Sequence, residues 1–299
     1  MPDPTSSFDA GDVPTPVRYI LIGMLLVGLA VDVALLFRFR SRQRTPPAAV
    51  LPLTSNPWTA TEVMPMVLIL LLLRALLLVG INVLHNGHWI LQENLMSVAI
   101  VLDTLFFHGA ALCLIVVVLR KLKLAWRDAF GLSVNDIRRR IACAAAFYVG
   151  AMPIVLLSAV VYAAFLIGIG YPLSPDDTQD VVGIFTQAGH ALWLKVYIGI
   201  VAVTLGPLVE ELLFRGIALP LLARYVPTGW AVCLVSAMFA LLHFHVPTLV
   251  PLFVIAVAFS YAYIYTGSIL VPVAMHSLFN GVSLVNALFM GKASAGLLF

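Results

Sequence analysis

The residues of this chain that could do chemistry lie in three short groups in its C-terminal half. These groups are Glu210-Glu211…Arg215, Phe239…His243 and His276…Asn280. Residues four apart on a helix share a face, so Glu211 can pair with Arg215. Glu210 lies about 100° round the helix and can face elsewhere. Together the groups supply a base, a partner for water and two hydrogen-bonding side chains, which is the set needed to hydrolyse an amide in a dry cavity.

Helices must bring these groups together. A turn signal at Pro227-Thr228-Gly229 separates Glu210 from His243, and antiparallel helices joined there would carry both side chains to a comparable depth. His276 and Asn280 are also four apart and project together. Taken singly, each position is better explained by a hydrogen-bond network that ties helices together. As a set on three successive helices, they favour catalysis.

The composition places these helices in a membrane. Of the 299 residues, 62% are hydrophobic and 10% are charged, whereas a soluble domain is about half apolar and about a quarter charged. A globule of this size has too little interior for so much apolar surface. The net charge of +3, from 17 basic and 14 acidic residues, is too weak and scattered for a nucleic-acid binder. The three cysteines show no CxxC spacing, so they indicate neither a disulfide framework nor a cysteine zinc site.

We therefore predict an all-α, polytopic transmembrane bundle of about eight helices, with the active site in a cavity between the C-terminal helices. The predicted spans are 18–37, 65–84, 95–119, 141–169, 191–209, 229–245, 248–265 and 268–290. The chain divides into a polar leader (1–17), N-terminal helices with basic loops (18–180), a catalytic core (190–290) and a tail (291–299). The acidic leader lacks the basic start and the cleavage site of a secretory signal, so the first span is expected to be retained.

The region after residue 190 cannot be one straight helix. Residues 191–226 would reach about 54 Å as a helix, which exceeds a hydrocarbon layer of about 30 Å. We expect a break near Gly206-Pro207 or between Gly216 and Pro220.

The basic residues predict the orientation. The loops at 38–44 and 120–140 hold 11 of the 17 lysines and arginines, and acidic residues dominate the opposite connections. The positive-inside rule puts both basic loops in the cytoplasm and the N-terminus outside. Residues 38–63 and 120–140 are interpreted as cytoplasmic connectors, the second with an amphipathic surface helix. The short, compact architecture is typical of a bacterial plasma-membrane protein.

Three further charges, Arg74, Asp103 and Asp32, lie at membrane depth, where each needs a partner or a cavity. Arg74 and Asp103 are at similar distances from the polar turn between the second and third spans. Antiparallel packing would place them side by side. We favour a structural ion pair over a transport role. Asp32 is expected to pair near the basic end of its span, and His108 is interpreted as an isolated histidine.

The three groups resemble the CPBP family, which comprises the CAAX prenyl endopeptidases of the Ras-converting type and bacterial bacteriocin-processing and lysostaphin-resistance-like relatives. The family pattern of EExxxR, FxxxH and HxxxN on successive membrane helices occurs here in order, over roughly 190–290. The resemblance implies an integral-membrane endopeptidase acting on a membrane-anchored protein or peptide.

By position in these motifs, Glu210 corresponds to the residue that activates the attacking water, helped by His243. His276 and Asn280 correspond to the groups that bind the oxyanion. The supporting residues are Glu211, Arg215 and Phe239.

Metal dependence is open at this point. Glu210, His243 and His276 could furnish three Zn²⁺ ligands with water as the fourth. Against zinc, the chain has no HExxH motif, and no partner is evident for the second nitrogen of either histidine.

Two other functions compete with proteolysis. A catalytically silent member of the same fold would bind a membrane partner through the same helices. A proton-coupled transporter would also use buried Glu and His residues, but the sequence shows no inverted repeat of the transporter kind.

Overall fold

The computed structural model describes residues 23, 26–30, 58–87, 92–132, 136–172 and 191–290, although not the side chains of 92–96 and 289–290. Within this part the chain is helical and has no strands. The leader, the tail, Asp32 and most of the first predicted span lie outside the described residues.

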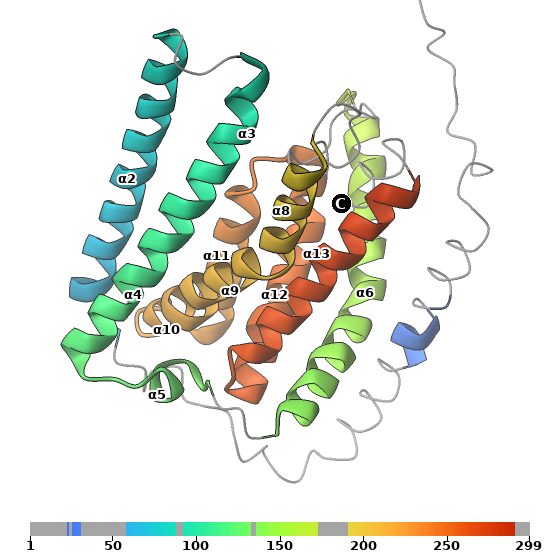
Figure 1. Cartoon of the computed structure of the whole chain (residues 1–299). Coiled ribbons are helices and arrows are strands. Elements are labelled where there is room, and N and C mark those ends of the chain that lie inside the picture. The colour runs from blue at the N-terminus through green and yellow to red at the C-terminus, as the bar shows by residue number, and fades with distance from the viewer. Residues whose placement is uncertain are drawn as a thin grey trace, which may run out of the picture.

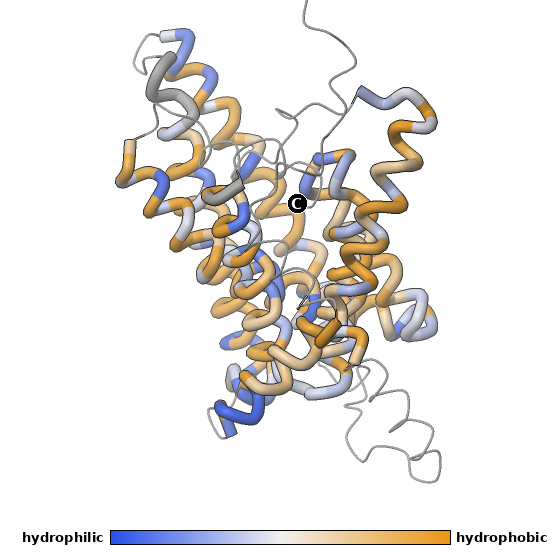
Figure 2. The backbone as a smooth tube through the Cα atoms, turned by 90° about the vertical axis from the view of Figure 1, so that its right-hand side faces the viewer, coloured by the Kyte–Doolittle hydropathy of each residue, from blue (hydrophilic) through white to orange (hydrophobic). Residues whose placement is uncertain are grey.

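Six described helices are long and apolar enough to cross a membrane. They are Ala60–Asn86, Ser97–Leu122, Ile137–Gly168, Leu192–Leu222, Val246–Thr266 and Leu270–Leu288. Thr228–Leu241 is also apolar but shorter. Hydrophobic residues run along most of the chain (Figure 2), and many point outward; Leu68, Leu71 and Leu72 are each 60% exposed. Outward leucines suit lipid rather than water as the surroundings. The protein is an integral, multi-pass membrane protein.

A helical hairpin forms one side of the molecule (Figure 1). Helix α2 (Ala60–Asn86) is followed by α3 (Gln92–Asp103), which continues through a π-helical turn, η3 (Thr104–His108), into α4 (Gly109–Leu122). On the other side lies α6 (Ile137–Gly168), which packs on the C-terminal helices.

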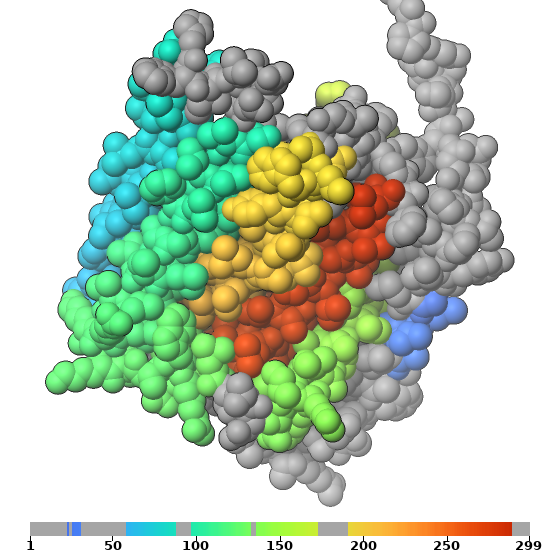
Figure 3. All heavy atoms as spheres, in the orientation of Figure 1, coloured from blue at the N-terminus to red at the C-terminus, as the bar shows by residue number. Residues whose placement is uncertain are grey.

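The C-terminal helices fill the space between. Helices α8 (Leu192–Val203), α9 (Leu205–Glu211), the π-helical η4 (Leu212–Ala218) and α10 (Leu219–Leu222) form one bent path. It is followed by α11 (Thr228–Leu241), the short 3₁₀ turn η5 (Val246–Thr248), α12 (Leu249–Thr266) and α13 (Leu270–Met290). In the orientation of Figure 3, side chains of α3, α8 and α13 meet on one face, where Leu194 and Ile198 are buried.

The predicted break after residue 190 is confirmed. At Thr204 the backbone leaves the helical region, with φ −123° and ψ −75°, and α9 begins at the next residue. Pro207 explains the position, because it has no N–H to donate to the carbonyl of Val203 and its ring disfavours a continuous helix. The π-helix η4 follows and ends just before Pro220.

A second irregularity involves Gly216 in η4. Pro220 has no N–H for the Gly216 carbonyl four residues earlier. The indole Nε1 of Trp58 donates to that oxygen instead, at 2.8 Å, in a buried site. A Cβ at Gly216 would lie 2.7 Å from the ring of Phe130. Glycine therefore lets an aromatic ring approach this part of the backbone closely.

The second connector contains a short helix that exposes Arg127 and Asp128 and also has a buried face. Its helix α5 (Trp126–Phe130) ends in a fully buried Phe130, whose carbonyl accepts the N–H of Ile269 at 3.0 Å. Gly131 follows with φ 62°, and a Cβ there would collide with the carbonyl of Gly267. The segment is held in the core because its apolar side chains fill the space beneath η4.

Candidate active site

A cavity of about 530 Å³ lies between the α2–α3 hairpin and the C-terminal helices. Glu210, His243, His276 and Asn280 all line it, as does Phe239. Three separate sequence groups therefore meet at one cavity. Glu211 and Arg215 are fully buried behind its wall.

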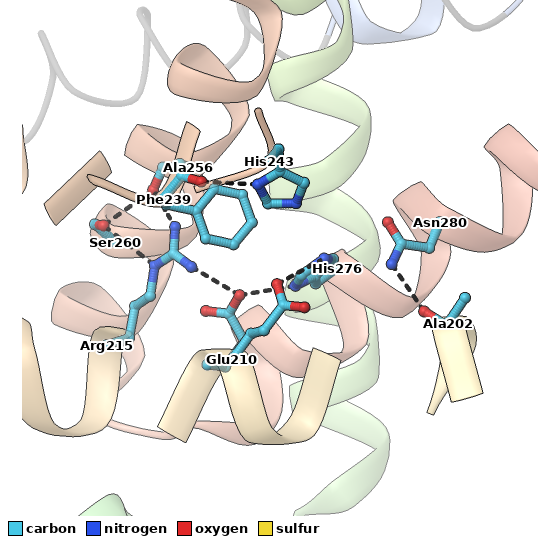
Figure 4. A network of polar contacts seen from close by, with 10 residues as sticks. Ala202, Glu210, Arg215, Phe239, His243, Ala256, Ser260, His276 and Asn280 are labelled. Atoms are coloured by element: carbon cyan, nitrogen blue, oxygen red, sulfur yellow. Dashed lines mark hydrogen bonds and ion pairs between the residues drawn. The ribbon is translucent and has the colours of Figure 1, made fainter. Parts of the chain in front are cut away.

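The two adjacent glutamates face different surroundings, as the helical spacing predicted (Figure 4). The Glu211 side chain has no exposed surface, and its Oε1 accepts a hydrogen bond from Arg215 Nη1 at 2.8 Å. The Glu210 side chain is 29% exposed and lines the cavity. Its Oε2 lies 3.9 Å from His276 Nε2. One glutamate is thus committed to structure and the other is available to a substrate.

His276 lies between these two carboxylates. Its Nδ1 is 2.9 Å from Glu211 Oε1, and because a carboxylate only accepts, Nδ1 carries the proton of that bond. The Phe259 ring stacks on the imidazole at 5.1 Å between centroids. These contacts fix the ring so that Nε2 faces Glu210.

Arg215 is a fully buried cation, and each of its three guanidinium nitrogens has a hydrogen-bond partner. Besides Glu211, its Nη2 donates to the Ala256 carbonyl at 2.9 Å and its Nε to Ser260 Oγ at 3.4 Å. Its Cζ lies 4.7 Å from the centroid of Phe239, a cation–π distance. This dense pairing compensates the cost of burying the charge.

His243 is oriented by the helix that precedes it. Its Nδ1 donates to the Phe239 carbonyl at 2.7 Å, because that oxygen can only accept. In the neutral ring Nε2 is then an acceptor. The Phe239 ring contacts both histidines, with centroid distances of 4.7 Å to His243 and 5.6 Å to His276.

Asn280 bridges α13 to the broken helix. Its Nδ2 donates to the Ala202 carbonyl at 2.8 Å. Ala202 is in the last turn of α8, where carbonyls lack donors within the helix. An amide carries two N–H groups, so one remains for the cavity.

Several site contacts carried no sequence signal. The bond between Glu211 and His276 joins residues 65 apart, and the Ala256 carbonyl has no side-chain signature. Ser260, a hydroxyl in the apolar run of α12, was the one available hint of a polar partner there.

The hairpin contributes charged residues to the same cavity. Arg74 Nε lies 3.5 Å from Asp103 Oδ1, which confirms the predicted pairing. Both residues line the cavity, and so does His108, which is therefore not isolated from the site.

A metal ion in a protein needs at least three suitable side chains close together. Among the described residues, no group of three or more His, Cys, Asp or Glu side chains is close enough to hold one. The second-nitrogen partners that the sequence left unidentified are now evident, since His243 and His276 use Nδ1 for Phe239 and Glu211.

Residues 191–282 match the family model described as type II CAAX prenyl endopeptidase Rce1-like. This segment is similar to an Rce1-like domain. It runs from the start of α8 into α13 and contains all seven residues of the three groups, so the family resemblance seen in the motifs is confirmed. The Rce1-like domain belongs to a family of membrane endopeptidases. No curated protein and no solved structure was found to match the chain.

Proposed function

We propose that this protein is an intramembrane endopeptidase that hydrolyses a peptide bond of a lipid- or helix-anchored protein or peptide. The observation that carries the proposal is the convergence of Glu210, His243, His276 and Asn280 on one cavity in the Rce1-like domain. A membrane-anchored substrate suits a cavity enclosed by transmembrane helices.

Glu210 is the general base. Its side chain is 29% exposed and lines the cavity, so a water molecule can approach it there. His243 presents Nε2 to the same cavity and accepts a hydrogen bond from that water. Together the two groups orient the water and withdraw its proton as the oxygen attacks the carbonyl carbon.

His276 and Asn280 stabilise the oxyanion of the tetrahedral intermediate. The free N–H of the Asn280 amide donates to it, and His276 donates from Nε2 when the ring is protonated. The proton taken by Glu210 then passes to the leaving amine. Glu211, Arg215 and Phe239 hold these groups in position without contacting the substrate.

The test of the base is Glu210→Gln, which keeps the shape of the side chain and removes its basicity. We expect kcat to fall at least about 100-fold, because general bases contribute roughly 10²–10⁴-fold. Comparing peptides from membrane fractions of cells with wild-type and Glu210→Gln protein identifies the substrate and measures the loss. Unchanged cleavage products would end the proposed role.

The proposed mechanism uses no metal ion, in keeping with the absence of a three-ligand group among the described residues. We expect purified, active protein to retain its cleavage rate in strong chelator and to hold no stoichiometric zinc. Loss of activity in chelator, with recovery on adding Zn²⁺, would establish the zinc mechanism instead.

A further inference from the structure

Among the described residues, two arginines form ion pairs with carboxylates at membrane depth, and the two pairs differ in burial. Glu211 and Arg215 have no exposed side-chain surface. In the other pair, the side chains of Arg74 and Asp103 are 46% and 34% exposed. A pair that only joins two helices in hydrocarbon gains from being enclosed, because exposed charges at that depth need water or a cavity.

The exposed surface of this second pair opens into the active-site cavity. Arg74 and Asp103 line the same volume as Glu210 and His276. Arg74 lies twelve residues before Asn86, the end of α2, so it is about 18 Å along the helix from that end. Half of the hydrocarbon layer is about 15 Å. Arg74 is therefore too deep to meet a lipid phosphate at the surface.

The guanidinium of Arg74 is held on one edge and open on the other. Its Nε faces Asp103, and its Cζ lies 5.5 Å from the ring centroid of Phe107. Within the described residues, no hydrogen-bond acceptor is recorded for Nη1 and Nη2. A planar guanidinium with a free edge binds carboxylates by two parallel hydrogen bonds.

We propose that Arg74 is a specificity-determining residue that binds a carboxylate of the substrate peptide. Asp103 and Phe107 orient the guanidinium, and its Nη edge receives the acid on the cavity wall formed by α2 and η3. The carboxylate comes either from the C-terminus of the substrate or from an acidic side chain. This inference rests on the proposed function, because it assigns the substrate class of the same cavity.

The experiment uses one palmitoylated apolar octapeptide in four forms, with the full-length protein in nanodiscs. Two forms differ in ending as a free acid or a carboxamide, and two carboxamide forms differ in an internal Glu or Gln. Wild type is expected to show a kcat/KM at least about 10-fold higher for the acid member of one pair. The pair that responds identifies the source of the carboxylate.

The double change of Arg74→Gln with Asp103→Asn removes both charges of the ion pair, so the net charge of the site does not change. We expect this variant to lose the preference for the acid, so that its kcat/KM values for the acid and neutral peptides lie within about 2-fold of each other. Arg120→Gln, at an exposed position at the end of α4, is the matched control and should keep the preference. A preference that survives the loss of Arg74, or no preference in wild type, would overturn the inference and leave the proposed function standing.

A binding measurement separates the two proposals. Photoreactive versions of the same peptides are cross-linked to protein carrying Glu210→Gln, with and without the Arg74 and Asp103 changes. Acid-over-amide labelling that requires Arg74 supports the inference even if no peptide is cleaved. Failure of wild type to cleave any peptide or membrane protein counts against the proposed function, and labelling without acid preference counts against Arg74.

Discussion

The two adjacent glutamates in this site have different surroundings. Glu211 is enclosed, and its Oε1 accepts hydrogen bonds from both Arg215 and His276, whereas Glu210 is left facing the cavity. We therefore expect a change at Glu211 to act through the fold and a change at Glu210 to act through the proposed chemistry.

We predict that Glu211→Ala lowers the free energy of unfolding by about 3–5 kcal/mol, because it leaves the Arg215 cation buried without its carboxylate. Glu210→Gln is expected to leave stability within about 1 kcal/mol. Thermal unfolding of the purified variants in the same detergent compares them. Equal destabilisation by the two changes would contradict the division of roles.

A double variant sharpens this comparison. Glu211→Leu with Arg215→Met replaces the buried pair by apolar side chains, which often restores stability. Activity should stay low, because His276 loses the acceptor for its Nδ1. Recovery of both stability and activity would show that Glu211 does no more than fill space.

For single residues, the sequence predicted the contacts that form within one helix. The four-residue spacing was enough for the bond between Glu211 and Arg215. It could not predict that Glu211 also holds His276, since that contact depends on how α9 and α13 pack. The Ala256 carbonyl was likewise unpredictable, because every residue carries such a group.

The path from α8 to α10 is shaped by its prolines and glycines. Pro207 explains why the helix restarts at Leu205, and Pro220 leaves the Gly216 carbonyl to Trp58. The π-helix between them carries Arg215. Such π-helical segments are frequent at functional sites, and here the irregular backbone is anchored by a residue 158 positions away.

We predict that Trp58→Phe destabilises the protein by about 1–3 kcal/mol, because a buried carbonyl loses its donor. Cleavage should weaken as η4 loses its anchor. Trp193→Phe is the matched control, since Trp193 is 60% exposed. Melting temperature and kcat of the two variants give the comparison, and equal effects would mean that the indole bond is dispensable.

Turn and proline signals predicted a break in the helix but left two regions possible for it, Gly206-Pro207 and Gly216 to Pro220. Nothing in the sequence indicated that Trp58 or Phe130 would contact this part of the chain. Both come from segments that look like connectors. Their place in the core follows from close contact at Gly131 and Gly216, which only packing reveals.

For the whole molecule, the lengths of the apolar runs in the sequence correctly predicted a helical bundle. Six described helices correspond to predicted spans, and the first span falls mostly outside the described residues. The 14-residue helix α11 is the exception, because the apolar sequence continues past its end at Leu241 into a turn. Hydropathy alone cannot distinguish a helix from an apolar turn.

The orientation of the chain in the membrane is also a prediction about the whole molecule. With Cys113, Cys143 and Cys233 replaced by serine, an impermeant thiol reagent should label Asn86→Cys in intact cells. Lys121→Cys, at the other end of the hairpin, should react only after permeabilisation. The reverse pattern would place the basic loops outside and contradict the positive-inside assignment.

The length of α11 also has a consequence for hydration. Fourteen residues rise about 21 Å, so α11 cannot cross a hydrocarbon layer of about 30 Å and one of its ends lies within it. The end beside His243 lines the cavity. Non-helical backbone at that depth is tolerated only where protein or water satisfies its polar groups. Water that occupies the space beyond the end of this short helix would lie beside His243, where the proposed hydrolysis needs its reactant.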